Sequence, residues 1–163
     1  GEVGCLAEDF ESAYLLAMEA SKVYRPKRGI LVSAGQEHEK LKFLPWAKKL
    51  SEMGHTLYAT DGTAKFLNEH GVTVTKVGWP GEKLGIDPVE LIRTKEVDLV
   101  INVPKSLQRD ELTRGSQIRQ AATRFGCSII TNMEKMVAYA QALADYPDFI
   151  KTHSPKPLPE YRA

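Results

Sequence analysis

The segment 59–63, with the sequence ATDGT, is the part of the chain best suited to hold a charged ligand. It follows an apolar run and precedes a helical pattern, so Thr60, Gly62 and Thr63 would stand where a strand turns into a helix. Backbone N–H groups and the positive end of the helix dipole attract phosphate or carboxylate at such a turn. A plainer interpretation stays open, in which Thr60 or Asp61 only caps the helix.

Other candidate ligand contacts follow later apolar runs. Trp79, in the sequence VGWPG, would either stack on a ligand or close the hydrophobic core. Asn102 lies at the end of the run 97–103. The stretch 105–124 begins with Lys105 and holds five basic and two acidic residues. Such a surplus of positive charge attracts an anion, or it simply forms a solvated helix face.

Motifs for several common chemistries are absent. The sequence has no GxGxxG, no GxxxxGK[ST] and no GxSxG, so dinucleotide binding, P-loop chemistry and a hydrolase nucleophile elbow have no support. The histidines and cysteines are scattered without metal-ligand spacing, and we predict free thiols in a reducing, cytoplasmic setting. They are His38, His55, His70, His153, Cys5 and Cys127.

The elements that must position these residues alternate regularly. Apolar runs at 30–34, 56–59, 72–77, 97–103 and 127–131 are separated by segments with helical periodicity. This alternation predicts right-handed crossovers and a single doubly wound α/β domain, in which helices cover both faces of a five-stranded parallel sheet. The run 72–77 alternates apolar and polar residues, which indicates an edge strand. In this fold, ligands bind at the carboxyl ends of the strands.

Helix boundaries are marked by several local signals. Glycines at 54, 71 and 126 follow helical patterns and predict left-handed stops. Pro45 is expected in the first turn of a helix, and Asp87 before Pro88 is expected to cap another. The opening pattern from Phe10 predicts a helix that either packs on this domain or belongs to a preceding one.

Composition limits the partners without pointing to a chemistry. The 163 residues carry 22 basic and 21 acidic side chains, a net charge of +1, so no bulk charge favours nucleic acid or an acidic membrane. No apolar stretch approaches the ~20 residues that a membrane-spanning helix needs. We therefore expect neither nucleic acid nor membrane as a partner.

The residues from about 29 to 143 resemble the methylglyoxal-synthase-like domain, in the version that closes the large chain of carbamoyl-phosphate synthetases. This resemblance implies the strand order 3-2-1-4-5. It also implies three parts: 1–28 as the end of a preceding synthetase half with a connector helix, 29–145 as the regulatory domain, and 146–163 as a proline-rich tail. The matching segments are LYATDGTAKFLNEHGV, VGWP, VDLVINVPK, ELTRGSQIRQAA and IITN.

The resemblance implies regulation rather than catalysis. In that family the domain binds small effectors, either nucleotides such as UMP and IMP or N-acetylglutamate. It communicates with ATP-grasp halves of the same large chain, which hold ATP and magnesium or manganese, and the enzyme also has a glutamine amidotransferase small chain. The parent enzyme makes carbamoyl phosphate for pyrimidine or arginine synthesis. For this fragment itself the resemblance implies no cofactor.

Both effector types are compatible with the residues that match the family patterns. The nucleotide pattern is matched by Lys40, Thr60, Thr63 and Asn102, whereas Trp79 and Pro104 replace a lysine and a threonine. The N-acetylglutamate pattern is matched by Thr60, Thr63, Trp79 and Asn102, whereas Lys105 and Gly115 replace two asparagines. Either Lys83 or Lys105 would supply the missing charge for a phosphate. The implied effector site is therefore Lys40, Thr60, Gly62, Thr63, Trp79, Asn102 and Lys105.

The catalytic relative in this family, methylglyoxal synthase, is the alternative. It acts on dihydroxyacetone phosphate with a carboxylate base in a Gly-Gly-Asp turn and a histidine in a Pro-His-Asp segment. Here Asp87 is displaced from the first position, and no histidine occurs between His70 and His153. Proton abstraction beside a carbonyl requires such a base, so the sequence favours the effector-binding domain.

Overall fold

One all-parallel sheet forms the centre of the molecule. The computed structural model describes residues 2–82, 85–104 and 109–149, with the side chains of 109–113 excepted. The strand order is β3-β2-β1-β4-β5, which confirms the order that the resemblance implied. The strands are β1 (Gly29–Ala34), β2 (Leu57–Thr60), β3 (Thr75–Val77), β4 (Val97–Val103) and β5 (Ser128–Ile130).

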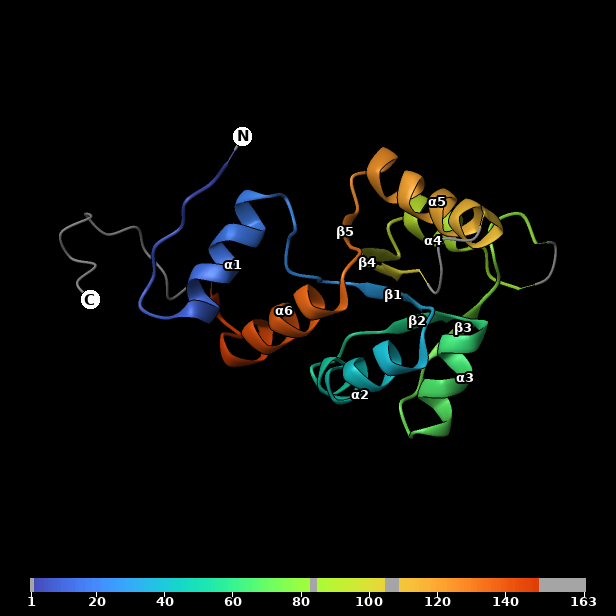
Figure 1. Cartoon of the computed structure of the whole chain (residues 1–163), viewed down its shortest axis with the longest axis horizontal. Helices are drawn as coiled ribbons and strands as arrows, with labels where there is room; N and C mark the ends of the chain where they lie inside the picture. The colour runs from blue at the N-terminus through green and yellow to red at the C-terminus, as the bar shows by residue number, and fades with distance from the viewer. Residues whose placement is uncertain (1, 83–84, 105–108, 150–163) are drawn as a thin grey trace.

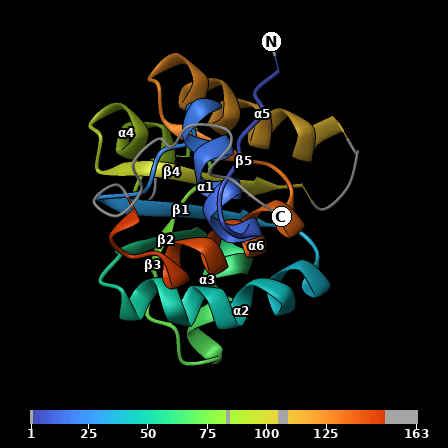
Figure 2. The same cartoon turned by 90° about the vertical axis from the view of Figure 1, so that its left-hand side faces the viewer.

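Helices cover both faces of this sheet, as predicted for a doubly wound α/β domain (Figures 1 and 2). The helices α2, α3 and α6 lie on one face, with α1 packed against α6, and α4 and α5 lie together on the other face. Their bounds are α1 (Phe10–Ala20), α2 (Glu37–Glu52), α3 (Asp61–Glu69), α4 (Pro88–Arg93), α5 (Arg109–Arg124) and α6 (Met133–Asp145).

The central strands are buried on both faces. In β1, Ile30 and Val32 join the core beneath α2 and α6, while Leu31 between them joins the core beneath α4 and α5. All three side chains are 0% exposed. Burying one such side chain stabilises a fold by about 1.5–3 kcal/mol, which is why the central strands are apolar throughout.

The opening helix packs on this domain. Leu15 and Met18 of α1 belong to the same core as α6, and the hydroxyl of Tyr14 donates a hydrogen bond of 3.1 Å to the backbone oxygen of Lys135. Figure 1 shows α1 beside α6 at one end of the molecule, with α3 and β3 at the other. The boundary at residue 28 stays a prediction.

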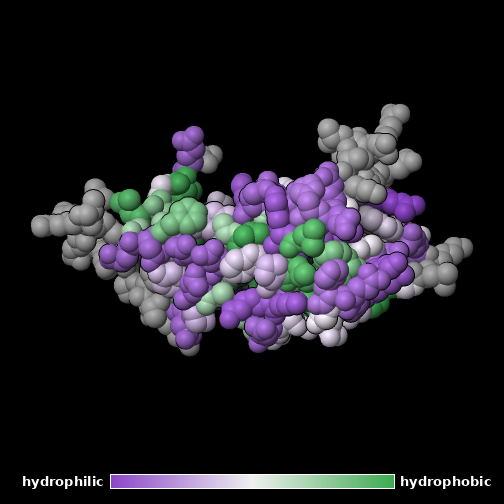
Figure 3. Space-filling view, turned by 60° about the horizontal axis from the view of Figure 1, so that its bottom comes forward, coloured by the Kyte–Doolittle hydropathy of each residue, from purple (hydrophilic) through white to green (hydrophobic). Residues whose placement is uncertain are grey.

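The prediction for Pro45 was wrong, because α2 begins eight residues earlier, at Glu37, and Pro45 lies inside it. A proline there leaves the carbonyl of Leu41 without its helical N–H partner. The helix tolerates this loss because Leu41 lies on its solvent side, where the side chain is 52% exposed. Figure 3 shows the side of the molecule that carries α2 and α3, and most of it is hydrophilic.

The edge strand and the glycine stops follow their predicted patterns, with one shift. Glycines 54, 71 and 126 have positive φ angles of 90°, 79° and 62° at helix ends. The strand β3 lies at the sheet edge as predicted, but it starts at Thr75 rather than 72. Asn68 causes this shift, because its side chain exchanges hydrogen bonds of 3.2 and 3.4 Å with the backbone of Val74.

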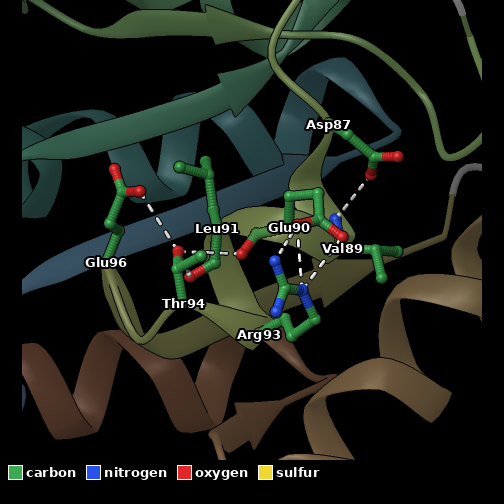
Figure 4. A network of polar contacts seen from close by, with 7 residues as sticks. All are labelled: Asp87, Val89, Glu90, Leu91, Arg93, Thr94 and Glu96. Carbon is green, nitrogen blue, oxygen red and sulfur yellow. Dashed lines mark hydrogen bonds and ion pairs between the residues drawn. The ribbon is translucent and has the colours of Figure 1, made fainter.

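The short helix α4 is held by side-chain contacts at both ends (Figure 4). Asp87 accepts a 2.8 Å hydrogen bond from the N–H of Val89, which confirms the predicted cap. Arg93 pairs with Glu90 through three hydrogen bonds, and the Thr94 hydroxyl donates to the backbone oxygen of Glu90. These contacts orient the segment that leads into β4.

No helix within the described ranges is long and apolar enough to cross a membrane. Most of the predicted tail, residues 150–163, lies outside the described residues. At least one of its first residues packs on the domain, because Phe149 is 3% exposed and belongs to the core of α1 and α6.

Gly29 gives a direct test of how closely the strands pack. A Cβ atom there would lie 2.7 Å from the ring of Tyr58 and 2.8 Å from the backbone oxygen of Glu96. We expect Gly29→Ala to lower the free energy of unfolding by about 1–3 kcal/mol, measured by urea denaturation. Gly4→Ala is the matched control, because nothing lies within 4 Å of its Cβ position. Equal urea midpoints for the two variants would contradict the packing described here.

Candidate functional site

A cavity of about 220 Å³ opens at the carboxyl ends of the strands. This is where a doubly wound sheet binds ligands, beside the point between β1 and β4 where the strand order reverses. The cavity brings together six of the seven predicted site residues, and Lys105 lies outside the described residues. Its wall consists of Ser33, Ala34, Gly35, Lys40, Thr60, Gly62, Thr63, Trp79, Asn102, Val103, Pro104 and Gly115.

Strand register places the polar residues at one level. Ser33 of β1 pairs with Asn102 of β4, and Thr60 ends β2 on the other side of β1. After Thr60 the chain turns directly into α3, and after Ala34 it crosses to α2. The three strand ends therefore form the floor of the cavity, and the starts of α2 and α3 form its sides.

Thr60 occupies the N-cap position of α3, but its side chain does not cap the helix. Its hydroxyl instead donates a 3.2 Å hydrogen bond to the Ser33 hydroxyl, and Thr60 is 3% exposed. Asp61 is turned outward into an ion pair of 2.5 Å with Lys76, which lowers the pKa of that carboxyl. Neither side chain therefore caps the first turn of α3, and no other described side chain is seen to do so. Gly62 and Thr63 of that turn line the cavity.

Thr63 is a structural member of the site. Its hydroxyl accepts a 3.0 Å hydrogen bond from the N–H of Ala34 and donates one of 3.1 Å to the carbonyl of Ala34. The side chain is 2% exposed. Both hydrogen-bonding directions of the hydroxyl are therefore engaged with β1, and Thr63 holds the start of α3 against the end of that strand.

Lys40 brings positive charge to the cavity. Its Nζ atom lies 3.2 Å from the backbone oxygen of Gly62, and 6.0 Å from the ring centroid of Phe66. Within the described part of the chain it makes no ion pair, and none of the cavity-lining residues is acidic. A cation without a counterion beside uncapped N–H groups and hydroxyls favours an anion in this cavity.

Sequence reasoning missed Arg119. Its Nη1 atom donates a 2.7 Å hydrogen bond to Oδ1 of Asn102, which is 2% exposed and lines the cavity. The basic surplus in 105–124 was the only available signal, and it did not single out one arginine. Another arginine of that stretch, Arg114, contacts Glu82 at 3.6 Å and thus has an acidic partner.

Trp79 both lines the cavity and packs against the core beneath α4 and α5. Its two predicted roles are therefore compatible. The guanidinium of Arg114 lies 6.0 Å from the Trp79 ring centroid, and the Glu82 carboxylate accepts a 3.0 Å hydrogen bond from the backbone N–H of Trp79. Trp79 also lines a second hollow of about 560 Å³. Lys83, the other candidate for an extra charge, lies outside the described residues.

The described cavity lining differs from the acid–base pair of methylglyoxal synthase. Asp87 lies in another hollow, beside α4, where it caps that helix. No histidine or carboxylate is among the described residues that line the cavity. Both cysteines are free, and burial raises the pKa of the Cys127 thiol to about 11. Among the residues described, no group of three or more His, Cys, Asp or Glu could hold a metal ion.

The fold and cavity define a doubly wound α/β domain with a positively charged, hydroxyl-lined hollow at its strand ends. The family model of the MGS-like domain matches residues 42–131, more than half of the chain. The chain belongs to the MGS-like domain family.

Relatives in this family are much longer proteins. The multifunctional protein pyr1-3 of Dictyostelium discoideum is 35% identical over 149 residues, covering 88% of this chain and 7% of that protein. The mitochondrial carbamoyl-phosphate synthase [ammonia] of Aquarana catesbeiana is 34% identical over 150 residues, covering 88% of this chain and 10% of that protein. The chain thus spans about a tenth or less of these relatives.

A solved structure of methylglyoxal synthase from Elizabethkingia anophelis NUHP1 superposes with a TM-score of 0.49 and 16% identity. It covers 82% of this chain and 98% of the synthase. A likeness of that size does not bear on the site.

The double hydrogen bond of Thr63 predicts a stability effect. Thr63→Val keeps the shape of the side chain but leaves the buried N–H and carbonyl of Ala34 without this partner. We expect a loss of about 1–3 kcal/mol in the free energy of unfolding, measured in urea. Thr63→Ser keeps the hydroxyl and should recover most of that loss. If serine is no better than valine, the hydroxyl contributes nothing to the fold.

Proposed function

We propose that this chain is the effector-binding domain of a carbamoyl-phosphate synthetase large chain, and that it regulates carbamoyl phosphate formation elsewhere in that chain. Long relatives that include a carbamoyl-phosphate synthase support this assignment, because the matched segment is a small part of each. The proposed partners are the ATP-grasp halves of the same chain and a glutamine amidotransferase small chain. ATP and magnesium or manganese would bind to those halves.

One observation carries the proposal: Lys40 has no acidic partner among the described residues and faces a cavity without described carboxylates. The matching ligand is a small anion. A UMP- or IMP-type nucleotide and N-acetylglutamate both satisfy this requirement, since each carries negative charge and carbonyl acceptors. In either case Lys40 and the first N–H groups of α3 would hold the anionic group, while Asn102 would bind a polar edge.

Trp79 would carry the effect of binding away from the cavity. It lines both the cavity and the second hollow, and its ring lies beside the guanidinium of Arg114 of α5. A ligand against the ring would therefore press on the layer formed by α4 and α5. The effector shifts the enzyme only by its difference in affinity between two states, typically about 1–3 kcal/mol.

A lyase of the methylglyoxal synthase type is not favoured. Such a reaction needs a general base near the substrate carbon, and Asp87, the residue nearest the position of that base in the sequence, caps α4 in a separate hollow.

Ligand binding should stabilise the chain against heat. An effector at about a hundred times its dissociation constant adds about 2.7 kcal/mol of stability. For a domain of this size we expect the melting temperature to rise by roughly 5–10 °C. The melt is recorded with UMP, IMP, N-acetylglutamate, ornithine and inorganic phosphate in turn. A rise with none of the anions would contradict an effector site that works in this chain alone.

Lys40 offers a matched pair of variants. Lys40→Met removes the charge but keeps a stem that can pack over Phe66, so we expect UMP or N-acetylglutamate to bind about tenfold or more weakly by calorimetry. Lys42→Met is the control on the same helix, because Lys42 points to Glu134, at 2.7 Å. Equal affinities for the two variants would show that Lys40 does not hold the anion.

A further inference from the structure

Gly115 lies in α5 at a point where any side chain would meet the pair formed by Asn102 and Arg119. A Cβ atom there would lie 2.9 Å from Nη1 of Arg119 and 3.3 Å from Oδ1 of Asn102. Gly115 is buried, lines the cavity and lies within a helix, where glycine is a poor choice compared with alanine. Its helical conformation does not need a glycine, since Gly115 is not among the glycines with positive φ. The space it leaves is therefore its distinguishing property.

That space allows Arg119 to orient the Asn102 amide. A guanidinium only donates hydrogen bonds, so it must face the oxygen of Asn102, as the 2.7 Å contact shows. Among the described side chains, Arg119 is the only hydrogen-bonding partner of the Asn102 side chain. With its oxygen occupied, Asn102 has its NH₂ group to offer the cavity. The nearby positive charge also makes that group a stronger donor.

We propose that Gly115 and Arg119 determine the ligand specificity of the cavity by fixing Asn102 as a hydrogen-bond donor. This inference rests on the proposed function, and it adds two positioning residues that act through Asn102. A donor at Asn102 accepts only a ligand that presents an oxygen or an aromatic nitrogen acceptor there, in addition to the anionic group held near Lys40. A zwitterionic ligand that turns an ammonium group toward Asn102 is rejected, because two donors would face each other.

The test separates the position of Arg119 from the fold. Gly115→Ala should leave the fold intact, because the clashing Arg119 atom is the end of a flexible side chain and alanine favours the helix. The melting temperature should stay equal or rise slightly. Calorimetry with UMP and N-acetylglutamate should nevertheless show binding weakened by about tenfold for the probe that the unmodified chain binds. The Asn102 side-chain amide signals in NMR spectra should shift even without ligand.

A double-mutant cycle tests whether Gly115 acts through Arg119. Arg119→Met should weaken the same probe by a similar factor, and Gly115→Ala added to it should cause no further loss. Ser116→Ala is the control on α5, because the Ser116 hydroxyl contacts only Gln120 among described side chains. It should change the affinity by less than about twofold and leave the Asn102 signals in place.

Three results would overturn the proposal. The first is that Gly115→Ala binds the probe as tightly as the unmodified chain does. The second is that the losses of affinity from Gly115→Ala and Arg119→Met multiply in the double variant. The third is that the Asn102 amide signals do not move in Gly115→Ala.

Failure of both probes to bind the unmodified chain would refute the proposed function instead. The NMR comparison needs no ligand, so it would still test the orienting role in that case.

Discussion

The pairing of β1 with β2 on one side and with β4 on the other is the constraint on which the site depends. From β1 the chain crosses to β2 and β3 in one direction and later to β4 and β5 in the other. The connections after β1 and β4 therefore diverge over opposite faces and leave a hollow between them. Register sets its floor, since Ser33 lies beside Asn102 and Ala34 beside Val103.

Each polar residue on that floor is held by a partner inside the protein. Thr60 bonds Ser33, Thr63 bonds the backbone of Ala34, and Asn102 bonds Arg119. Buried polar groups need such partners, because leaving one unsatisfied costs about 1–3 kcal/mol. The same contacts restrict what the cavity offers a ligand. Thr63 has already donated its one hydroxyl proton, whereas Asn102 retains its two N–H groups.

The charge of the cavity is also a product of pairing. Over the whole chain, acidic and basic residues nearly cancel. In the structure several acidic residues pair with cations other than Lys40: Asp61 with Lys76, Glu134 with Lys42, and Glu82 with Arg114. Lys40 remains without an acidic partner among the residues described, so a nearly neutral chain acquires a locally positive hollow. These exposed ion pairs contribute little to the stability of the fold. Their effect here is that the positive charge of Lys40 is left without a described counterion at the cavity.

The sequence by itself determined the elements and their kind. Apolar runs, helical periods and glycine stops depend on neighbours along the chain, and they predicted the strands, the helices and the doubly wound class. The predicted position of Pro45 in a first helical turn was wrong, because a proline inside a helix is less destabilising where the carbonyl that loses its hydrogen bond lies on the solvent side. That carbonyl belongs to Leu41, which is exposed. The start of β3 shifted because the side chain of Asn68 bonds the backbone of Val74.

The residues of the candidate site were likewise predictable only in part from the sequence. The motif after β2 and the residues that end the other strands could be found from the chain, because strand ends are local features. Only the tertiary structure decided that Thr63 bonds the backbone of Ala34, that Asp61 turns outward and that Arg119 reaches Asn102 past Gly115. Those contacts depend on how each helix sits against the sheet. Spacing along the chain does not predict these contacts, because the side chains that form them come from separate elements that only the packed core brings together.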